Sequence, residues 1–198
     1  MKLFRNLRNL LALIGIAAIV AVGYYGPGLW KYKAAFDGFD PQAKGMYMDM
    51  ADALVESGNS AAATVWRTKV ADGLTAEDVG QSIQTIADER NIKSVGFLPL
   101  GDQVAAMTGE DWRVLNIYLY CNPLTAAKMV EFDPAFAAYL PCRVSLVEDE
   151  TGQLWIYTLN MDLMIYGGET LPPELLEEAL RVKETMLQIL ERAAEGDF

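Results

Sequence analysis

The chain has 198 residues, two cysteines and no histidine, and its formal net charge is −11. The lack of histidine excludes Ser-His-Asp and Cys-His hydrolases and sites in which histidine binds zinc or haem. No Gly-rich phosphate loop is present and the acidity argues against nucleic-acid binding, so the composition favours a binding protein without a cofactor over an enzyme.

The N-terminal region is predicted to be a membrane anchor. The first 33 residues carry five of the 16 Lys and Arg residues and none of the 27 Asp and Glu residues, which leaves a net charge of −16 on the rest. Residues 9–30 are uncharged and would form a helix about 33 Å long, enough to cross a hydrocarbon core of about 30 Å. Gly26-Pro27-Gly28 is expected to end this helix, so residues 1–28 are the predicted anchor and residues 29–60 a linker and a helix.

The charges around this segment predict its orientation. Lys2, Arg5 and Arg8 precede it, so the positive-inside rule places the N-terminus in the cytoplasm and the rest of the chain in the periplasm, with a single pass through the inner membrane. The alternative is a cleaved signal peptide, because Ala21-Val22-Gly23 is an acceptable cleavage site.

Small and aromatic residues in the anchor predict contact with other membrane subunits as well as with the lipid bilayer. Gly15 and Ala18 would let a second helix approach closely. Tyr24, Tyr25 and Trp30 gather at the membrane exit, where aromatic belts lie.

Beyond the anchor, strands and helices intermix along the chain. Helices are expected over residues 41–57, 75–90, 102–108, 123–131, 134–139, 161–166 and 172–194, and strands over 61–71, 92–100, 113–120, 142–148 and 153–160. Leu115, Ile117 and Leu119 are expected to face the core. The pattern predicts an α+β fold for residues 61–198, with a four- or five-stranded, largely antiparallel sheet covered by helices.

Three dipeptides stand within or next to the expected strands. Gly96-Phe97 lies in the second strand, Asn122-Pro123 follows the third, and Leu140-Pro141 precedes the final hairpin. With these motifs, residues 62–195 resemble the bacterial family known as domain of unknown function 302. The resemblance implies a compact α+β fold and brings no agreed reaction. Cys121 and Cys142 replace a glycine and an aliphatic residue of that pattern, so their roles are not carried over from the family.

Cys121 would end one strand and Cys142 would begin another, with two short helices returning the chain between them. If these strands are antiparallel neighbours, a disulfide between the two thiols is geometrically possible. Two inert buried thiols, or a redox-active or metal-binding pair, are the alternatives.

Met46, Met48 and Met50 alternate along the chain, and on a strand they could bind Cu(I), which prefers soft sulfur ligands. A helix, which is favoured here, would bring only Met46 and Met50 together and would use the methionines for packing. No other metal site is expected.

The main functional prediction is a non-catalytic accessory subunit of an inner-membrane complex, acting by binding. A thiol- or copper-handling protein is the first alternative, and an enzyme of unknown type is the second. Acidic residues in the C-terminal half could attract a basic periplasmic protein or could form only a solvated surface.

Overall fold

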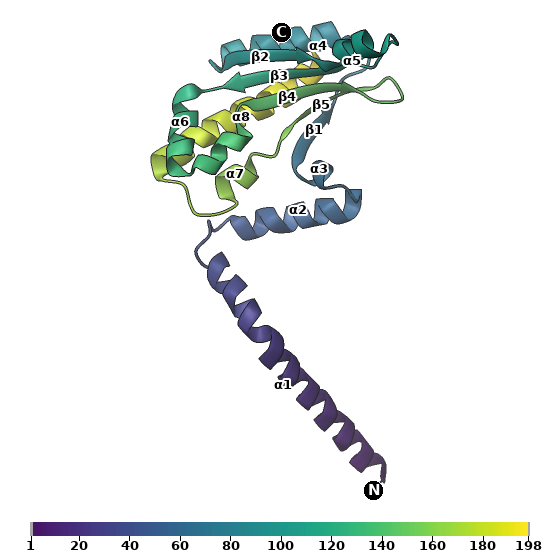
Figure 1. Cartoon of the computed structure of the whole chain (residues 1–198), viewed down its shortest axis with the longest axis vertical. Coiled ribbons are helices and arrows are strands. Elements are labelled where there is room, and N and C mark those ends of the chain that lie inside the picture. The colour runs from purple at the N-terminus through teal and green to yellow at the C-terminus, as the bar shows by residue number, and fades with distance from the viewer. Residues whose placement is uncertain (1, 198) are drawn as a thin grey trace.

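The computed structural model describes residues 2–197, and it describes the side chains of all of these except residues 2–5, 7, 8, 27 and 29. The helices are α1 (Lys2–Phe36), α2 (Ala43–Ser57), α3 (Ser60–Ala63), α4 (Ala76–Glu89), α5 (Leu100–Thr108), α6 (Pro123–Phe132), the 3-10 helix η1 (Pro134–Tyr139), α7 (Asp162–Tyr166) and α8 (Pro173–Glu195). The strands are β1 (Val65–Lys69), β2 (Lys93–Pro99), β3 (Leu115–Cys121), β4 (Cys142–Glu148) and β5 (Leu154–Leu159). The predicted α+β fold is confirmed (Figure 1).

The helix α1 has 35 residues and extends away from the rest of the chain (Figure 1). Its segment Asn9–Gly26 has a mean hydropathy of 1.8, and none of it is buried inside the protein. By length and composition this helix could cross a membrane, and a signal sequence would meet the same description.

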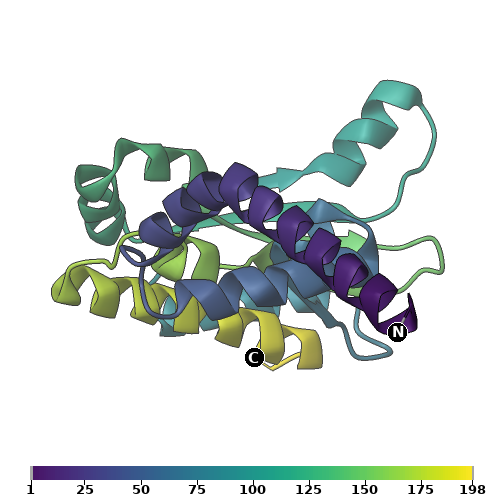
Figure 2. The ribbon, with the colours of Figure 1, turned by 90° about the horizontal axis from the view of Figure 1, so that it is seen from below.

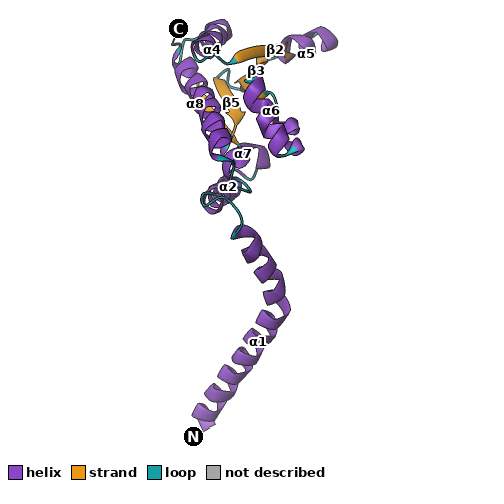
Figure 3. Cartoon of the chain, turned by 90° about the vertical axis from the view of Figure 1, so that its left-hand side faces the viewer, coloured by secondary structure: helices purple, strands orange, loops and turns teal. Residues whose placement is uncertain are grey.

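The prediction that this helix ends at Gly26-Pro27-Gly28 is wrong. The helix α1 continues to Phe36 and so includes residues 29–36 of the predicted linker. A proline inside a helix removes one backbone hydrogen bond, and a long helix accommodates the loss by bending. Figure 3 shows such a bend part-way along α1.

All five strands form one antiparallel sheet in the order β1-β5-β4-β3-β2. The helices α4 and α8 contact each other and lie on the same side of this sheet (Figure 3). Thr75 and Asp78 form the predicted capping box at the start of α4, and Val79, Ile83 and Ile86 on its inner face are fully buried.

The strand β1 is shorter than predicted. The Asn59 side chain accepts a hydrogen bond from the backbone N–H of Ala61, at 2.9 Å, and caps the helical turn α3. This cap takes residues 60–63 out of the expected strand, which begins at Val65.

The side chains of strand β3 face the opposite way from the prediction. Tyr120 is fully buried, and Tyr118 packs against the same core beneath α4 and α8, whereas Leu115, Ile117 and Leu119 lie outside this core. The Tyr120 hydroxyl donates to the Gln84 side chain of α4, at 3.4 Å, so the ring is buried while its polar end has a partner. Because side chains alternate along a strand, the aliphatic residues of β3 face away from the helices.

Aromatic contacts join α1 to the folded domain. The Phe36 ring lies 5.2 Å from that of Phe39 and 6.0 Å from that of Tyr47 on α2, measured between centroids. The Tyr47 hydroxyl donates to the carbonyl of Gly167, at 2.6 Å, and the Asp40 N–H donates to the carbonyl of Gly168, at 2.7 Å. The exit of the long helix is therefore held by both α2 and the loop after α7.

The two faces of β3 predict very different costs of truncation. Replacing Tyr120 by Ala should lower the free energy of unfolding by about 3–5 kcal/mol, because it leaves a large cavity beneath α4. Replacing Ile117 by Ala, on the other face of the same strand, should cost about 1 kcal/mol. Denaturant unfolding of the full chain in detergent measures both values, and equal losses would contradict the observed orientation of β3.

Candidate functional site

The side of the sheet opposite α4 and α8 is an apolar surface that no described helix crosses. Figure 1 looks onto this side, and the strands lie in front of the helices. We call it the open sheet face. Its members are Val65, Arg67 and Lys69 of β1, Trp155, Tyr157 and Leu159 of β5, Arg143, Ser145 and Val147 of β4, Leu115, Ile117 and Leu119 of β3, and Gly96 and Leu98 of β2. None of these residues belongs to the core cluster.

Strand register makes the open sheet face continuous from edge to edge. One cross-strand row runs through the paired positions Leu98, Ile117, Ser145, Tyr157 and Arg67, and so includes all five strands. Leu98 is 39% exposed, and Ile117, Ser145 and Tyr157 are half-buried. Directly paired side chains on one sheet face lie about 5 Å apart, so the row forms one continuous strip that is apolar or aromatic except at Ser145 and at Arg67, its last member.

Exposed basic residues lie at the β1 end of this strip and beside its middle member on β4. Arg67 and Lys69 lie on β1, and Arg143 lies on β4 beside Leu119. The Arg67 guanidinium stacks over the Trp155 ring, 5.1 Å from its centroid. Among the described residues, neither Arg67 nor Arg143 forms an ion pair, so both charges are free to meet an acidic group on a partner.

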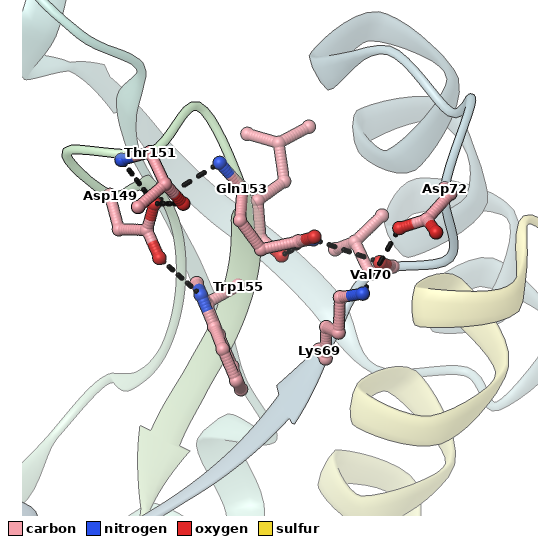
Figure 4. Close-up of polar contacts among 8 residues, drawn as sticks. Lys69, Val70, Asp72, Asp149, Thr151, Gln153 and Trp155 are labelled. Carbon is pink, nitrogen blue, oxygen red and sulfur yellow. Dashed lines mark hydrogen bonds and ion pairs between the residues drawn. The ribbon is translucent and has the colours of Figure 1, made fainter.

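The turn between β4 and β5 holds Trp155 in place (Figure 4). The Asp149 carboxylate accepts hydrogen bonds from the Trp155 indole N–H at 2.9 Å, from the Thr151 hydroxyl at 2.6 Å, and from the backbone N–H groups of Thr151 at 2.8 Å and Gln153 at 3.1 Å. These bonds, with that from the Thr151 hydroxyl first, lower the pKa of Asp149 to about 2. The Gln153 amide also donates to the carbonyl of Val70, at 3.0 Å, which ties the turn to the end of β1.

The helices α5 and α6 bound the open sheet face at its two ends. Figure 2 shows α5 projecting beyond the sheet on one side and α6 with η1 on the other. Met107 on α5 is 88% exposed, so that flank carries further apolar surface. Leu124 on α6 is 77% exposed but lines a groove with Arg90 and Arg181, on the side of α4 and α8.

The two cysteines lie near each other at one end of the sheet. Cys142 pairs with Tyr120 across β3 and β4, so it faces the core, and Cys121 follows Tyr120 directly. Both are free thiols in the structure, and burial raises the pKa of both, that of Cys142 to about 11. Both line one small cavity, so their proximity agrees with the expectation, and the disulfide stays a prediction.

Two of the three dipeptides from the sequence lie where one element gives way to the next, and the third lies inside β2. Asn122 caps α6 by accepting hydrogen bonds from the N–H groups of Leu124 and Thr125, and Pro123 begins that helix. Leu140-Pro141 is a cis peptide bond before β4. Gly96 lies at an irregularity in β2 where an added Cβ would come within 3.0 Å of Leu119, and the Phe97 ring lies 4.9 Å from that of Tyr118.

The methionines of α2 do not form one site. Met46 is buried, Met48 is 56% exposed, and their helical spacing turns them to different sides of α2, as the helical interpretation predicts. The anchor residues Gly15, Ala18, Tyr24, Tyr25 and Trp30 all lie exposed on α1. A Cβ added at Gly15 would meet no described atom within 4 Å.

A wide hollow of about 730 Å³ lies along α4 and α8 and is lined by side chains of both charges. It is an open groove between surface ion pairs, such as Arg181 with Glu177, and it brings no nucleophile or base toward a common point. We therefore do not assign the candidate site to it.

Comparison with known proteins supports the family and the fold. The family described as "Domain of unknown function DUF302" matches residues 66–193. A crystal structure of an uncharacterized conserved DUF302 protein from Bacillus stearothermophilus has a TM-score of 0.51 and 16% sequence identity, with 66% of this chain and 98% of that chain covered. That likeness establishes the fold alone. No curated protein has significant similarity to this chain.

The bonding of Asp149 predicts a dependence of stability on pH. An unfolded aspartate titrates near pH 3.9, about two units above the folded pKa, so the ionised carboxylate stabilises the fold above that pH and this stability is lost as the pH falls toward 2. The Asp149→Asn variant should be less stable than the parent at pH 6, and its stability should fall less steeply between pH 5 and 2.

Chemical unfolding at a series of pH values measures this difference. The matched control is Asp111→Asn, which alters an exposed carboxylate that makes no hydrogen bond to the described residues. Equal acid sensitivity of the two variants would show that Asp149 does not anchor the turn.

Proposed function

The chain belongs to the DUF302 family, whose description assigns no reaction, and from its geometry we propose that it is a membrane-anchored binding module and accessory subunit of an inner-membrane complex. The observation that carries this proposal is the open sheet face, a largely apolar surface that also carries Arg67 and Arg143, neither of which is ion-paired among the described residues. Large contiguous apolar patches on a folded domain mark interaction sites.

The partner that fits the open sheet face is an acidic extramembrane segment of another membrane subunit. The protein is acidic overall, yet Arg67 and Arg143 lie on this one face without an ion pair among the described residues, and Lys69 beside them is paired with Asp72 at 3.0 Å. Two copies packed face to face through a two-fold axis would bring these cations toward one another, which disfavours such a dimer. An acidic and partly apolar segment could pack its apolar side chains on the open sheet face and form ion pairs with Arg67 and Arg143.

The direction of the open sheet face supports a partner in the same membrane. In Figure 1 the long helix α1 runs downward while this face looks toward the viewer, so the face is directed sideways relative to α1. A neighbouring subunit with its own membrane helix would stand in that direction. Contacts between Phe36, Phe39 and Tyr47 hold the domain close to the exit of α1.

The anchor offers a second contact with the same partner. Gly15 and Ala18 are one helical turn apart and leave a shallow, fully exposed place on α1 against which another helix could pack. Tyr24 and Trp30 lie on the same helix beyond this place, where aromatic side chains could meet a neighbouring subunit at the membrane surface.

The acidic surface supports a basic periplasmic partner less well. Glu177, Glu178 and Asp197 are each paired with a cation of the same chain, and Glu148 accepts a hydrogen bond from the backbone N–H of Val114. Pairing within the chain reduces the field that would attract a basic protein.

The first prediction from this proposal is the topology. Lys2, Arg5 and Arg8 before the apolar segment favour a cytoplasmic N-terminus, so a reporter fused after Phe198 should be active only if it functions in the periplasm. Intact mass should include residues 1–23, because an anchor is retained. Activity of a reporter that functions only in the cytoplasm would contradict the topology, and a mass that begins after Gly23 would identify a cleaved signal peptide.

The second prediction is a partner at the open sheet face. A photo-crosslinking amino acid at Leu98 should capture an acidic segment of a membrane protein in intact cells, and the same group at Glu184, on the opposite side, should not. Arg67→Glu with Arg143→Glu should weaken co-purification by about tenfold or more, as like-charge repulsion of 1.4 kcal/mol implies.

Three matched variants separate the causes of any loss. Arg181→Glu on α8 reverses a charge away from the open sheet face and should have little effect. Gly15→Leu adds bulk at a place where an added Cβ meets no described atom within 4 Å, so weaker co-purification would locate a helix partner on α1, and Ile16→Leu is its control. Capture of a second copy at Leu98, or equal capture from both positions, would overturn the proposed partner.

A further inference from the structure

Five sulfur-bearing side chains line one small, partly open cavity at the end of the sheet. They are Cys121 at the end of β3, Cys142 at the start of β4, Met129 on α6, Met161 just before α7 and Met164 within α7. These residues come from separate segments of the chain, which the fold brings together. Neither the family match nor the open sheet face accounts for them.

The size of this cavity limits what it can hold. Its volume is about 30 Å³, enough for one water-sized particle and far below the 300 Å³ or more of typical cavities for organic ligands. A water molecule needs two to four polar partners, and the lining residues are almost all apolar. A single ion with an affinity for sulfur fits both the size and the lining.

The ligand set distinguishes among metals. Thiolate and thioether sulfur favour Cu(I), whereas structural zinc sites use four Cys, His or carboxylate ligands, and Mg²⁺ and Ca²⁺ require oxygen. The cavity has two cysteines and three methionines, and no Asp, Glu, Lys or Arg lines it. Met129 and Met161 are 4% and 5% exposed, so their sulfur atoms are already desolvated.

The arrangement is built into rigid parts of the fold. Each cysteine stands beside a dipeptide that shapes the cavity wall, Cys121 before Asn122-Pro123 and Cys142 after Leu140-Pro141. Asn122 fixes the start of α6, which carries Met129 inward. The salt bridge between Lys128 and Glu178, at 2.6 Å, holds α6 against α8.

From this placement we infer that the cavity formed by Cys121, Cys142, Met129, Met161 and Met164 is a binding site for one Cu(I) ion. Binding breaks one cysteine S–H bond, forms a Cu–S bond and releases the proton to solvent, with no change in the oxidation state of copper or sulfur. One thiolate and one Cu(I) ion are neutral together, as an apolar cavity without charged side chains requires. The site does not depend on the proposed partner.

The test is a Cu(I) titration of the full-length protein in detergent. The protein is reduced and kept without oxygen, and a colorimetric Cu(I) chelator competes for the metal. We expect one Cu(I) per chain, with only sulfur neighbours in the X-ray absorption spectrum. Cys121→Ser, Cys142→Ala and Met129→Leu should each weaken binding by at least about tenfold, the smallest loss typical even of groups that only support metal ligands.

Two other methionines provide matched controls. Met186→Leu alters a fully buried thioether on α8 and Met46→Leu alters a buried one on α2, and both lie outside the cavity. Thermal unfolding without metal shows whether each variant is folded, and Met129→Leu preserves volume, so it tests the site even if a cysteine variant is unstable.

Several results would overturn the copper site. These are nitrogen or oxygen neighbours in the absorption spectrum, equal losses in the control variants, or no binding by the reduced protein. Non-reducing mass spectrometry tests the competing disulfide. If a two-hydrogen loss maps to Cys121 and Cys142 in the native protein and reduction does not restore Cu(I) binding, the cysteines serve as a bridge instead.

Discussion

The structure depends on the packing of the β3 tyrosines beneath α4 and α8. Tyr120 is fully buried with its hydroxyl directed to Gln84, and Tyr118 reaches α4 at Gly80, where an added Cβ would lie only 2.5 Å from the phenol oxygen. Because a strand has only two faces, this choice turns Leu115, Ile117 and Leu119 outward. The open sheet face is apolar because β3 places its two tyrosines in the core and its three aliphatic side chains on the other side of the sheet.

The sequence predicts the existence and order of most elements, because their signals are local. The capping box at Thr75 and Asp78, the glycine after α2 at Gly58 and the prolines that open α6 and η1 each determine a boundary within a few residues. The orientation of β3 is not a local property. Both of its faces are apolar, so alternation alone cannot choose between them, and hydrophobicity ranks leucine above tyrosine. The one available signal was Gly80, a glycine inside an otherwise amphipathic helix, which leaves room for a bulky neighbour.

The candidate sites were partly hidden for the same reason. The proximity of the two cysteines follows from antiparallel pairing of successive strands, which the two intervening helices permit. Nothing local to Met129 or Met161 connects them with those cysteines, because α6 and α7 are separate elements that each pack against α8. The regularly spaced methionines of α2 carried the stronger sequence pattern and yet diverge around a helix. Ligands that come from four different elements produce no periodic pattern in the sequence.

The register between β3 and β4 links the two proposals without making either depend on the other. It pairs Leu119 with Arg143 on the open sheet face and, one position on, Tyr120 with Cys142 on the core face. A partner on the open sheet face would therefore press on the same backbone that holds one wall of the sulfur cavity. Side chains alternate between the two faces of β4, so Arg143 can serve the open sheet face while Cys142 serves the sulfur cavity. A slip of one residue in this pairing would exchange the faces of β4, so selection for either site would preserve the register that the other requires.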